Sequence, residues 1–352
     1  FERSGPGAGA SGNVAGLIMP RLDLGDTAPA RFFLQAYLHT LSLIERLKTT
    51  TDERLFTPTG VLLKTVTQED AEKSAQLVAA GLLPFDYIET HADGVLYPQA
   101  GVIAPRAYVS ALMGDTECCT EPVLEILTRT DTAIIRTPAR SIAFDAAVIA
   151  NGGDALSFLQ ARSLPLAGVA GQIDYFPDAE APETAVAAGP YAAPAPGGGL
   201  VIGATYDALE RGAAPEPSQS ATLQNIKAAA SLEQSVSALD PERSQPRASV
   251  RCQTPDRLPV VGSLPDWGFF SGAYDDLRQG KRGPYPPAQY APRLHILSAL
   301  GSRGLVTAPL CAELIASALA GAPSPVDRRV REALHPARFF IRDLKRSTPP
   351  KR

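Results

Sequence analysis

The chain has 352 residues, which at about 150 residues per domain suggests two domains with at least one sizeable core. Hydrophobic residues make up 45% and charged residues 20%, which is typical of folded domains and excludes disorder, collagen and coiled coil. No run of about 18 consecutive apolar residues predicts a membrane span, and the first residues lack the apolar region of a signal peptide. We therefore expect a cytoplasmic protein.

The charge is unevenly distributed along the chain. Residues 327–352 contain nine Lys or Arg and three Asp or Glu, whereas the whole chain has a net charge of −4. A tail of +6 on a body of −10 is typical of a protein that contacts a polyanion such as RNA, and equally of a solvated basic helix.

The cysteines and histidines do not form a metal or catalytic motif. The four cysteines are Cys118, Cys119, Cys252 and Cys311, and the four histidines are His39, His91, His295 and His335. Neither set has the spacing of zinc ligands. We interpret these side chains as structural, expect no metal and no disulfide framework, and leave the catalytic residue unassigned.

A glycine-rich segment lies near the start of the chain. Residues 4–16 include five glycines and can bring backbone N–H groups close to an anionic ligand, or form a flexible loop. Glu2, just before it, stands where dinucleotide folds place an acidic residue at a strand end to bind ribose.

Apolar periodicity and turn residues predict the remaining elements. Helices are predicted over 30–47, 105–113, 218–239 and 305–319. Strands are predicted over 60–63, 85–88, 94–98, 122–126, 143–150, 171–176, 199–203, 248–251 and 294–300. Residues 143–150 run into a glycine turn at 151–153, which indicates a buried parallel strand.

The segment 265–292 is rich in Gly, Pro, aromatic and basic residues and predicts a long binding loop or lid. Its aromatic residues are Trp267, Phe269, Phe270, Tyr274, Tyr285 and Tyr290, and its basic residues include Arg278, Lys281 and Arg282. This composition suits stacking on an unpaired RNA loop, and equally an insertion with a few buried rings.

Two predicted strands end in glycine turns, at 150–153 and at 301–304, and a helix follows the second turn directly. Such turns let backbone amides and a helix N-terminus face an anionic group. Together with the loop after Glu2, they indicate a cofactor site.

Three groups of motifs carry a family resemblance. They are residues 9–13, Arg251 with 254–262, and 298–313. They resemble the FAD-dependent oxidoreductase domain of the bifunctional tRNA 5-methylaminomethyl-2-thiouridine biosynthesis proteins, within the glycine and D-amino-acid oxidase superfamily. The similarity runs from Glu2 to about Lys345.

The resemblance implies a mixed α/β (α+β) fold: a Rossmann-like FAD-binding domain of the amino-acid-oxidase type and an interleaved substrate domain with an antiparallel or mixed sheet. The FAD-binding domain would comprise residues 1–50, 99–160 and 292–352, and the substrate domain residues 51–98 and 161–291. The family's first βαβ unit and its methyltransferase domain would precede Phe1. Ala170 stands where the family usually has an arginine, so any role of that arginine is in doubt.

The resemblance also implies a set of site residues. FAD would contact Glu2, Ser11, Gly12, Asn13, Gly16, Val123, Ala150, Asn151, Gly152, Gly301, Ser302, Arg303, Gly304 and Leu305. Arg251 would bind a substrate carboxylate and Tyr191 would line the substrate pocket. From the residues alone, a surface or salt-bridged strand arginine is the favoured interpretation of Arg251.

The implied function is oxidative removal of the carboxymethyl group from 5-carboxymethylaminomethyl-2-thiouridine at the tRNA wobble position, with FAD as cofactor and tRNA as partner. One alternative is an FAD-dependent oxidase of a small amino acid such as glycine or sarcosine. A second alternative is an inactive fragment that does not retain FAD.

Overall fold

Strands and helices are interleaved along the chain in the computed structural model, which describes residues 1–49, 55–210 and 212–346. The helices are α1 (Ala28–Lys48), α2 (Gln68–Ala79), α3 (Pro105–Met113), α4 (Gln219–Ala230), α5 (Trp267–Ala273), α6 (Gly304–Ala320), α7 (Arg328–Leu334) and α8 (Arg338–Arg346). The strands are β1 (Gly16–Ile18), β2 (Phe56–Thr57), β3 (Val61–Lys64), β4 (Glu89–His91), β5 (Gly94–Tyr97), β6 (Gly101–Ile103), β7 (Glu125–Thr128), β8 (Ala133–Arg136), β9 (Ser141–Phe144), β10 (Ala147–Ile149), β11 (Ala167–Phe176), β12 (Ala185–Ala187), β13 (Tyr191–Pro194), β14 (Leu200–Gly203), β15 (Asp207–Ala208), β16 (Gln245–Gln253), β17 (Val260–Pro265) and β18 (Tyr290–Ser298). This is the mixed α/β fold that the sequence predicts.

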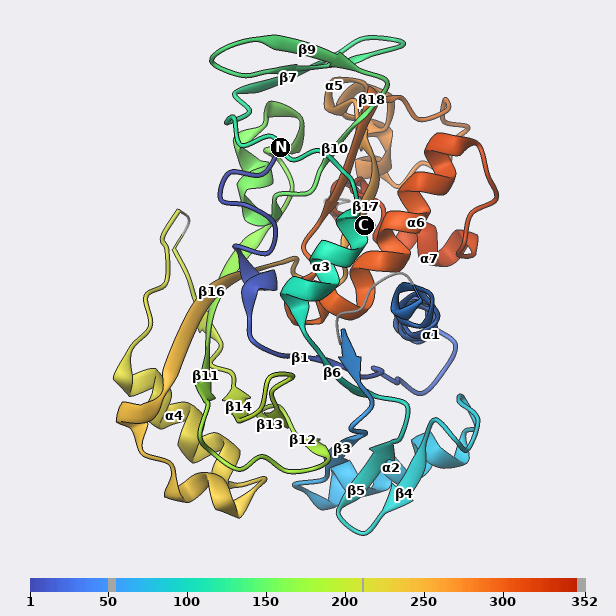
Figure 1. The fold of residues 1–352 in the computed structure, drawn as a ribbon. Helices are drawn as coiled ribbons and strands as arrows, with labels where there is room; N and C mark the ends of the chain where they lie inside the picture. Colours follow the sequence, from blue (N-terminus) through green and yellow to red (C-terminus); the bar gives the residue numbers. More distant parts are fainter. Residues whose placement is uncertain (50–54, 211, 347–352) are drawn as a thin grey trace.

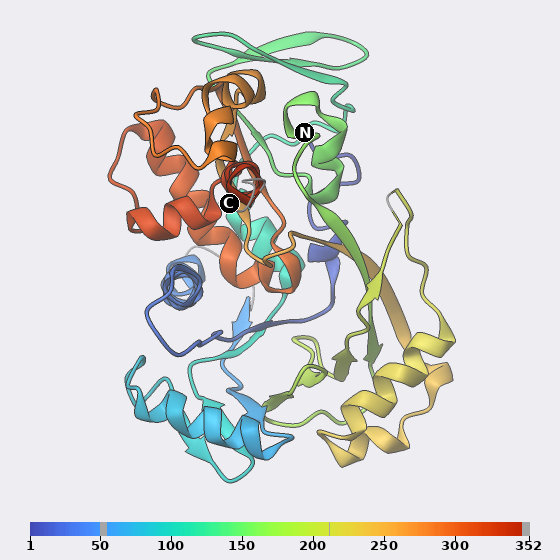
Figure 2. The ribbon, with the colours of Figure 1, turned by 180° about the vertical axis from the view of Figure 1, so that it is seen from behind.

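The largest sheet has nine strands in the order β15-β11-β14-β13-β12-β3-β5-β4, with β16 paired to β11. It occupies the lower half of the molecule in Figure 1, where α2 and α4 lie beside it. β11 and β16 are antiparallel and pair from Ala167↔Gln253 to Tyr175↔Gln245. These two long strands run from the large sheet toward the upper half of the molecule (Figure 2).

A smaller sheet in the upper half contains a parallel pair, β10 and β18, with β17 antiparallel on the other side of β18. Ile149 of β10 packs beside the buried Leu294 and Ile296 of β18. A buried parallel strand before the glycine turn is therefore confirmed. The predicted strand 143–150 is nevertheless wrong as one unit: the chain bends at residues 145 and 146, so β9 pairs with β8 in a separate hairpin sheet.

The predicted helices at 30–47 and 305–319 are confirmed as α1 and α6, which pack together through Phe32, Phe33, Leu310 and Leu314. Thr40 Oγ1 donates a hydrogen bond of 2.7 Å to the carbonyl of Val306 and ties the two helices. Residues 301–320 are long and apolar enough to cross a membrane. Because their buried side chains pack on α1, we interpret α6 as a core helix.

Several predicted boundaries are wrong. Residues 85–87 form a turn after Pro84, and the strand begins at Glu89. The strand expected at 122–126 begins at Glu125. The helix expected over 218–239 ends at Ala230, because the backbone N–H of Leu232 bonds to the carbonyl of Ala229 and the chain tightens into a 3₁₀ turn.

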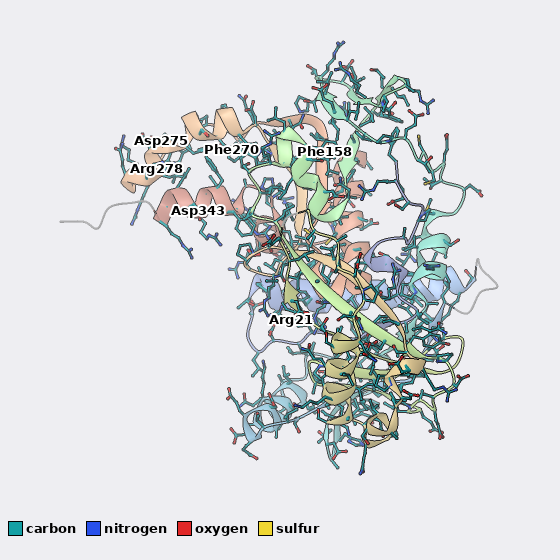
Figure 3. The ribbon with its side chains drawn as sticks, turned by 90° about the vertical axis from the view of Figure 1, so that its left-hand side faces the viewer. Arg21, Phe158, Phe270, Asp275, Arg278 and Asp343 are labelled. Carbon is teal, nitrogen blue, oxygen red and sulfur yellow. The ribbon has the colours of Figure 1, made fainter. Side chains whose placement is uncertain are left out.

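The predicted loop at 265–292 is wrong for its first half, which is helical, whereas residues 281–289 are irregular. Asp266 caps α5 by accepting from the N–H of Phe269 at 3.0 Å, and a 3₁₀ helix (Asp275–Gln279) follows. Phe270 and Tyr274 are buried in a cluster with α8. Figure 3 shows Phe270, Asp275, Arg278 and Asp343 in this lobe. The basic side chain Arg278 is paired with Asp275 at 2.8 Å, and residues 281–289 form neither helix nor strand. A role for this segment as a lid or a stacking surface stays a prediction.

A fully buried carboxylate joins the large sheet to α4. Asp174 on β11 accepts hydrogen bonds from Gln172 (3.1 Å), Thr222 (2.6 Å), Asn225 (2.7 Å) and Ser244 (2.8 Å). A buried carboxylate without these donors would be strongly disfavoured, so the four donors are needed to satisfy it.

Replacing Asp174 by alanine will remove an acceptor from each of its four donors. We expect the free energy of unfolding to fall by about 3 kcal/mol, measured by urea denaturation. Asp178→Ala is the matched control, because Asp178 is exposed and pairs only with the exposed Arg243 at 2.7 Å. A loss from Asp174→Ala no larger than that of the control would contradict this role.

His335 is held neutral in the folded protein. Its Nδ1 accepts from the N–H of Ala337 at 3.1 Å, and its ring packs edge-on against Tyr290. Burial, together with the positive charges of Arg338 and Arg331, lowers the pKa of His335 to about 4, and Glu332 opposes the shift.

The unfolded chain protonates this histidine at its ordinary pKa, so it binds more protons than the folded chain between pH 6.5 and about 4. Above pH 6.5 the histidine is neutral in both states and does not lower the free energy of unfolding. As the pH falls toward 4, the free energy of unfolding decreases by on the order of 2 kcal/mol, because the unfolded chain binds the proton more tightly. Thermal unfolding of His335→Gln across this window should show a flatter pH profile than the wild type. An unchanged profile, or the same flattening in the exposed His91→Gln, would refute the assignment.

Candidate active site

The glycine-rich loop folds onto β16. The guanidinium Nη2 of Arg247 donates to the carbonyls of Ala8 (2.7 Å) and Gly9 (2.6 Å). Gly12 is buried where an added Cβ would overlap both the Gly7 carbonyl and this guanidinium. Only glycine allows this close approach, which explains why residue 12 is a glycine.

The same loop continues into contact with the glycine turn before α6. An added Cβ at Gly16 would overlap Cδ1 of Leu305, in the first turn of α6. Two predicted cofactor segments, 11–16 and 301–305, are therefore side by side. Between them, Oδ1 of Asn13 is buried and has no hydrogen-bond partner among the described residues.

Arg303 lies at the N-terminus of α6 and is partly buried. Burial lowers the pKa of its guanidinium and Arg21 lowers it further, whereas Asp23 and Tyr97 act in the opposite direction. No acceptor in the described part of the chain bonds to its side chain, and it forms no ion pair there. A partly buried cation at a helix N-terminus is suited to an anionic or electron-rich group. Figure 3 places Arg21 between the upper and lower halves of the molecule.

The other glycine turn follows β10. The Ser298 hydroxyl, at the end of β18, donates to the carbonyl of Gly152 at 2.9 Å and lies 3.7 Å from Cys252 Sγ. The carboxyl ends of the parallel strands are thus tied together, as expected at the ligand-binding edge of a dinucleotide fold. Ala150 and Asn151 are exposed beside this turn.

Glu2 is exposed, and its N–H donates to the carbonyl of Cys119 at 2.8 Å. The next residue, Arg3, pairs with Asp154 at 3.3 Å, so the start of the chain lies beside the Gly152 turn. Val123 is partly buried against the core around β10 and β18. These residues therefore lie near the glycine turn at 151–153. They are not part of the contact between Gly16 and Leu305.

The two predicted substrate residues lie close enough to interact electrostatically, although β14 and β11 separate their strands, β13 and β16, in the sheet. Arg251 on β16 lies over Gly171, where an added Cβ would overlap its guanidinium, and its Nη1 donates to the Thr205 carbonyl at 3.0 Å. Burial lowers the pKa of Arg251, and Tyr191 and Tyr206 raise it.

Tyr191 stays protonated beside this arginine. Burial raises the pKa of Tyr191 to about 12, although Arg251 opposes the shift. No carboxylate in the described ranges pairs with Arg251, so the interpretation as a salt-bridged strand arginine does not hold. The pair offers a cation and a hydroxyl donor to one ligand.

Sequence reasoning missed three members of these contacts. Gly171 is required for Arg251 to lie flat on β11, and Tyr206 reaches from the other side to hydrogen-bond Gln253. Arg247 carries no motif, and only the fold brings it to the glycine loop. Ala170, which stands where the family usually has an arginine, pairs with Val250 within the sheet. Arg251, the next residue on β16, is therefore the arginine at this place in the sheet.

No group of three or more His, Cys, Asp or Glu side chains in the described ranges is arranged to hold a metal ion.

A family model described as FAD-dependent oxidoreductase matches residues 1–318. The chain is 32% identical over 368 residues to the tRNA 5-methylaminomethyl-2-thiouridine biosynthesis bifunctional protein MnmC of Pseudomonas paraeruginosa, and 31% identical over 370 residues to that of Pseudomonas putida. Each match covers 96% of this chain and 55% of the relative, so the chain spans about half the length of these proteins.

Solved structures show the same fold. Glycine oxidase from Geobacillus kaustophilus superposes with a TM-score of 0.71 at 21% identity, covering 95% of this chain and 90% of that one. Iminodiacetate oxidase from Chelativorans sp. BNC1 gives a TM-score of 0.70 at 17% identity, covering 95% and 91%. With the family match over residues 1–318, the chain belongs to the FAD-dependent oxidoreductase family and is an enzyme that uses FAD.

Proposed function

We propose that this enzyme removes the carboxymethyl group from 5-carboxymethylaminomethyl-2-thiouridine at the tRNA wobble position and leaves the 5-aminomethyl base. The names of the relatives support the tRNA substrate, and the half-buried Arg251 without an ion-pair partner supports recognition of a carboxylate. The second observation carries the proposal, because a buried guanidinium is costly unless an anion compensates it.

The residues present fit FAD. Gly12 and Gly16 leave no room for a Cβ, Asn13 offers an unused buried oxygen, and Arg303 offers a partly buried cation. We propose that these residues, with Glu2 and the turns 150–152 and 301–305, hold the cofactor. When bound, FAD accepts a hydride from the carbon between the amine nitrogen and the carboxylate.

The chain itself positions the substrate. Nη1 of Arg251 is fixed by the Thr205 carbonyl, which leaves its other N–H groups for the substrate carboxylate. The protonated hydroxyl of Tyr191 adds a neutral donor in the same place. Water then releases the oxidised carbons as glyoxylate, and the base keeps its amino group.

A small amino acid oxidase is the second candidate, because a carboxylate of glycine or sarcosine would suit Arg251 equally well. The fold shared with glycine oxidase and iminodiacetate oxidase favours this reading. Comparing kcat/KM for modified tRNA with kcat/KM for glycine distinguishes the two candidate functions.

We further propose that the oxidoreductase works beside a methyltransferase domain, since its relatives are bifunctional and about twice its length. A tRNA substrate places such an enzyme in the cytoplasm. The division into segments 1–50, 99–160 and 292–352 against 51–98 and 161–291 remains our proposed domain organisation.

Replacing Arg251 by lysine keeps the charge but removes the planar fork. In the full-length protein we expect kcat/KM for modified tRNA to fall roughly 30- to 100-fold, which corresponds to about 2–3 kcal/mol. Steady-state kinetics measure the change, and flavin absorbance checks that the cofactor remains bound. The matched control is Arg243→Lys, because Arg243 is an exposed surface arginine just before the same strand. Equal activity of Arg251→Lys and the control would contradict carboxylate binding.

A further inference from the structure

A basic cavity lies between the glycine loop, the start of α3 and the start of β16. The cavity has a volume of about 420 Å³ and is formed by residues 12–14 of the glycine loop, 104–106 at the start of α3, and 245–247 at the start of β16. Two arginines line it, Arg106 and Arg247, and none of the residues that form it is acidic. We propose that this cavity binds a phosphodiester of the substrate RNA. The inference rests on the proposed tRNA function.

The two arginines are held near each other without compensation. Burial lowers the pKa of Arg247, and the positive charge of Arg106 lowers it further. Neither arginine forms an ion pair with a carboxylate of the described ranges. Two like charges are unfavourable at short range, and an anion between them removes the repulsion.

Unused polar atoms point to a ligand as well. Nε of Arg247 is buried without a hydrogen-bond partner in the described part of the chain, although its Nη2 is fixed by two loop carbonyls. The guanidinium is therefore already oriented, and Arg106 on the first turn of α3 is exposed toward solvent. A preorganised arginine beside an accessible one is typical of phosphate recognition.

The distance between Arg247 and Arg251 on β16 favours an RNA substrate over a free amino acid. Arg247 and Arg251 are four residues apart on one strand, so their side chains share a face and their Cα atoms are about 13 Å apart. Glycine or sarcosine is too short to reach both arginines. A nucleotide whose base lies at Arg251 keeps its backbone outside the pocket, where the cavity offers its cations.

The basic residues elsewhere are less suited to this role. Arg338 of the basic tail pairs with Asp256 at 2.9 Å, Arg328 with Glu332 at 2.6 Å, and Arg342 with Asp343 at 3.3 Å. The last six residues, 347–352, lie outside the described ranges. Of the basic groups compared, the Arg106–Arg247 pair is the one that faces a cavity without a carboxylate.

The test measures binding of tRNA that carries 5-carboxymethylaminomethyl-2-thiouridine to the full-length, FAD-loaded protein over a range of salt concentrations. Arg106→Gln should raise the Kd about tenfold and flatten the slope of log Kd against log salt by about 0.7 for one lost phosphate contact. Arg106→Lys should keep most of the slope, because it keeps the charge. KM for the tRNA should rise with little change in kcat.

Arg247→Gln should act in the same direction, and flavin content shows whether the glycine loop still holds the cofactor. Arg243→Gln is the matched control, because that arginine is exposed and outside the cavity. An unchanged Kd and salt slope in Arg106→Gln would overturn the inference. So would loss of flavin from Arg106→Gln with no loss of tRNA affinity, which would assign the cavity to the cofactor's pyrophosphate. A wild-type protein that binds no tRNA would instead reject the proposed function itself.

Discussion

The pairing of β16 with β11 is the constraint on which the site depends. One antiparallel ladder, from Ala167↔Gln253 to Tyr175↔Gln245, carries β16 past each group of candidate residues. Arg247 meets the glycine loop, Arg251 lies over Gly171, and Cys252 packs beside the Gly152 turn. Because the side chains of a strand alternate, this single register decides which residues face the ligand, and a shift by one position would turn both arginines away.

Buried positive charge is the second common feature. Burial lowers the pKa of Arg247, Arg251 and Arg303, and none of them pairs with a carboxylate in the described ranges. In a chain with a net charge of −4, acidic partners are plentiful on the surface, so their absence here is informative. Backbone carbonyls hold Arg247 and Arg251 in place but do not neutralise their charge. A bound anion would compensate each of the three arginines, which is the basis of the proposed ligand sites.

Much of this arrangement was predictable from sequence, because it depends on local patterns. The helical spacing over 30–47 and the apolar run before Asn151 identified α1 and β10, and the strand predicted at 248–251 lies within β16. The helical residues 267–279 were mispredicted because the Gly and Pro content of the segment indicates a loop, whereas burial of Phe270 and Tyr274 against α8 drives this part to fold. Tertiary packing of this kind leaves no periodic signal in a short helix. Arg247 was missed for a related reason: its role arises from the glycine loop that the fold brings against it. The roles of the predicted site residues remain predictions.

The proposed function requires that the protein holds FAD and passes it electrons from a carboxymethylamino group on RNA. This is tested by the visible absorption spectrum of the full-length protein, loaded with FAD and mixed without oxygen with tRNA carrying 5-carboxymethylaminomethyl-2-thiouridine. We expect the oxidised flavin band to bleach with this tRNA and to persist with tRNA carrying the 5-aminomethyl base. A band that persists with both tRNAs, or bleaches only with glycine, would contradict the proposed function.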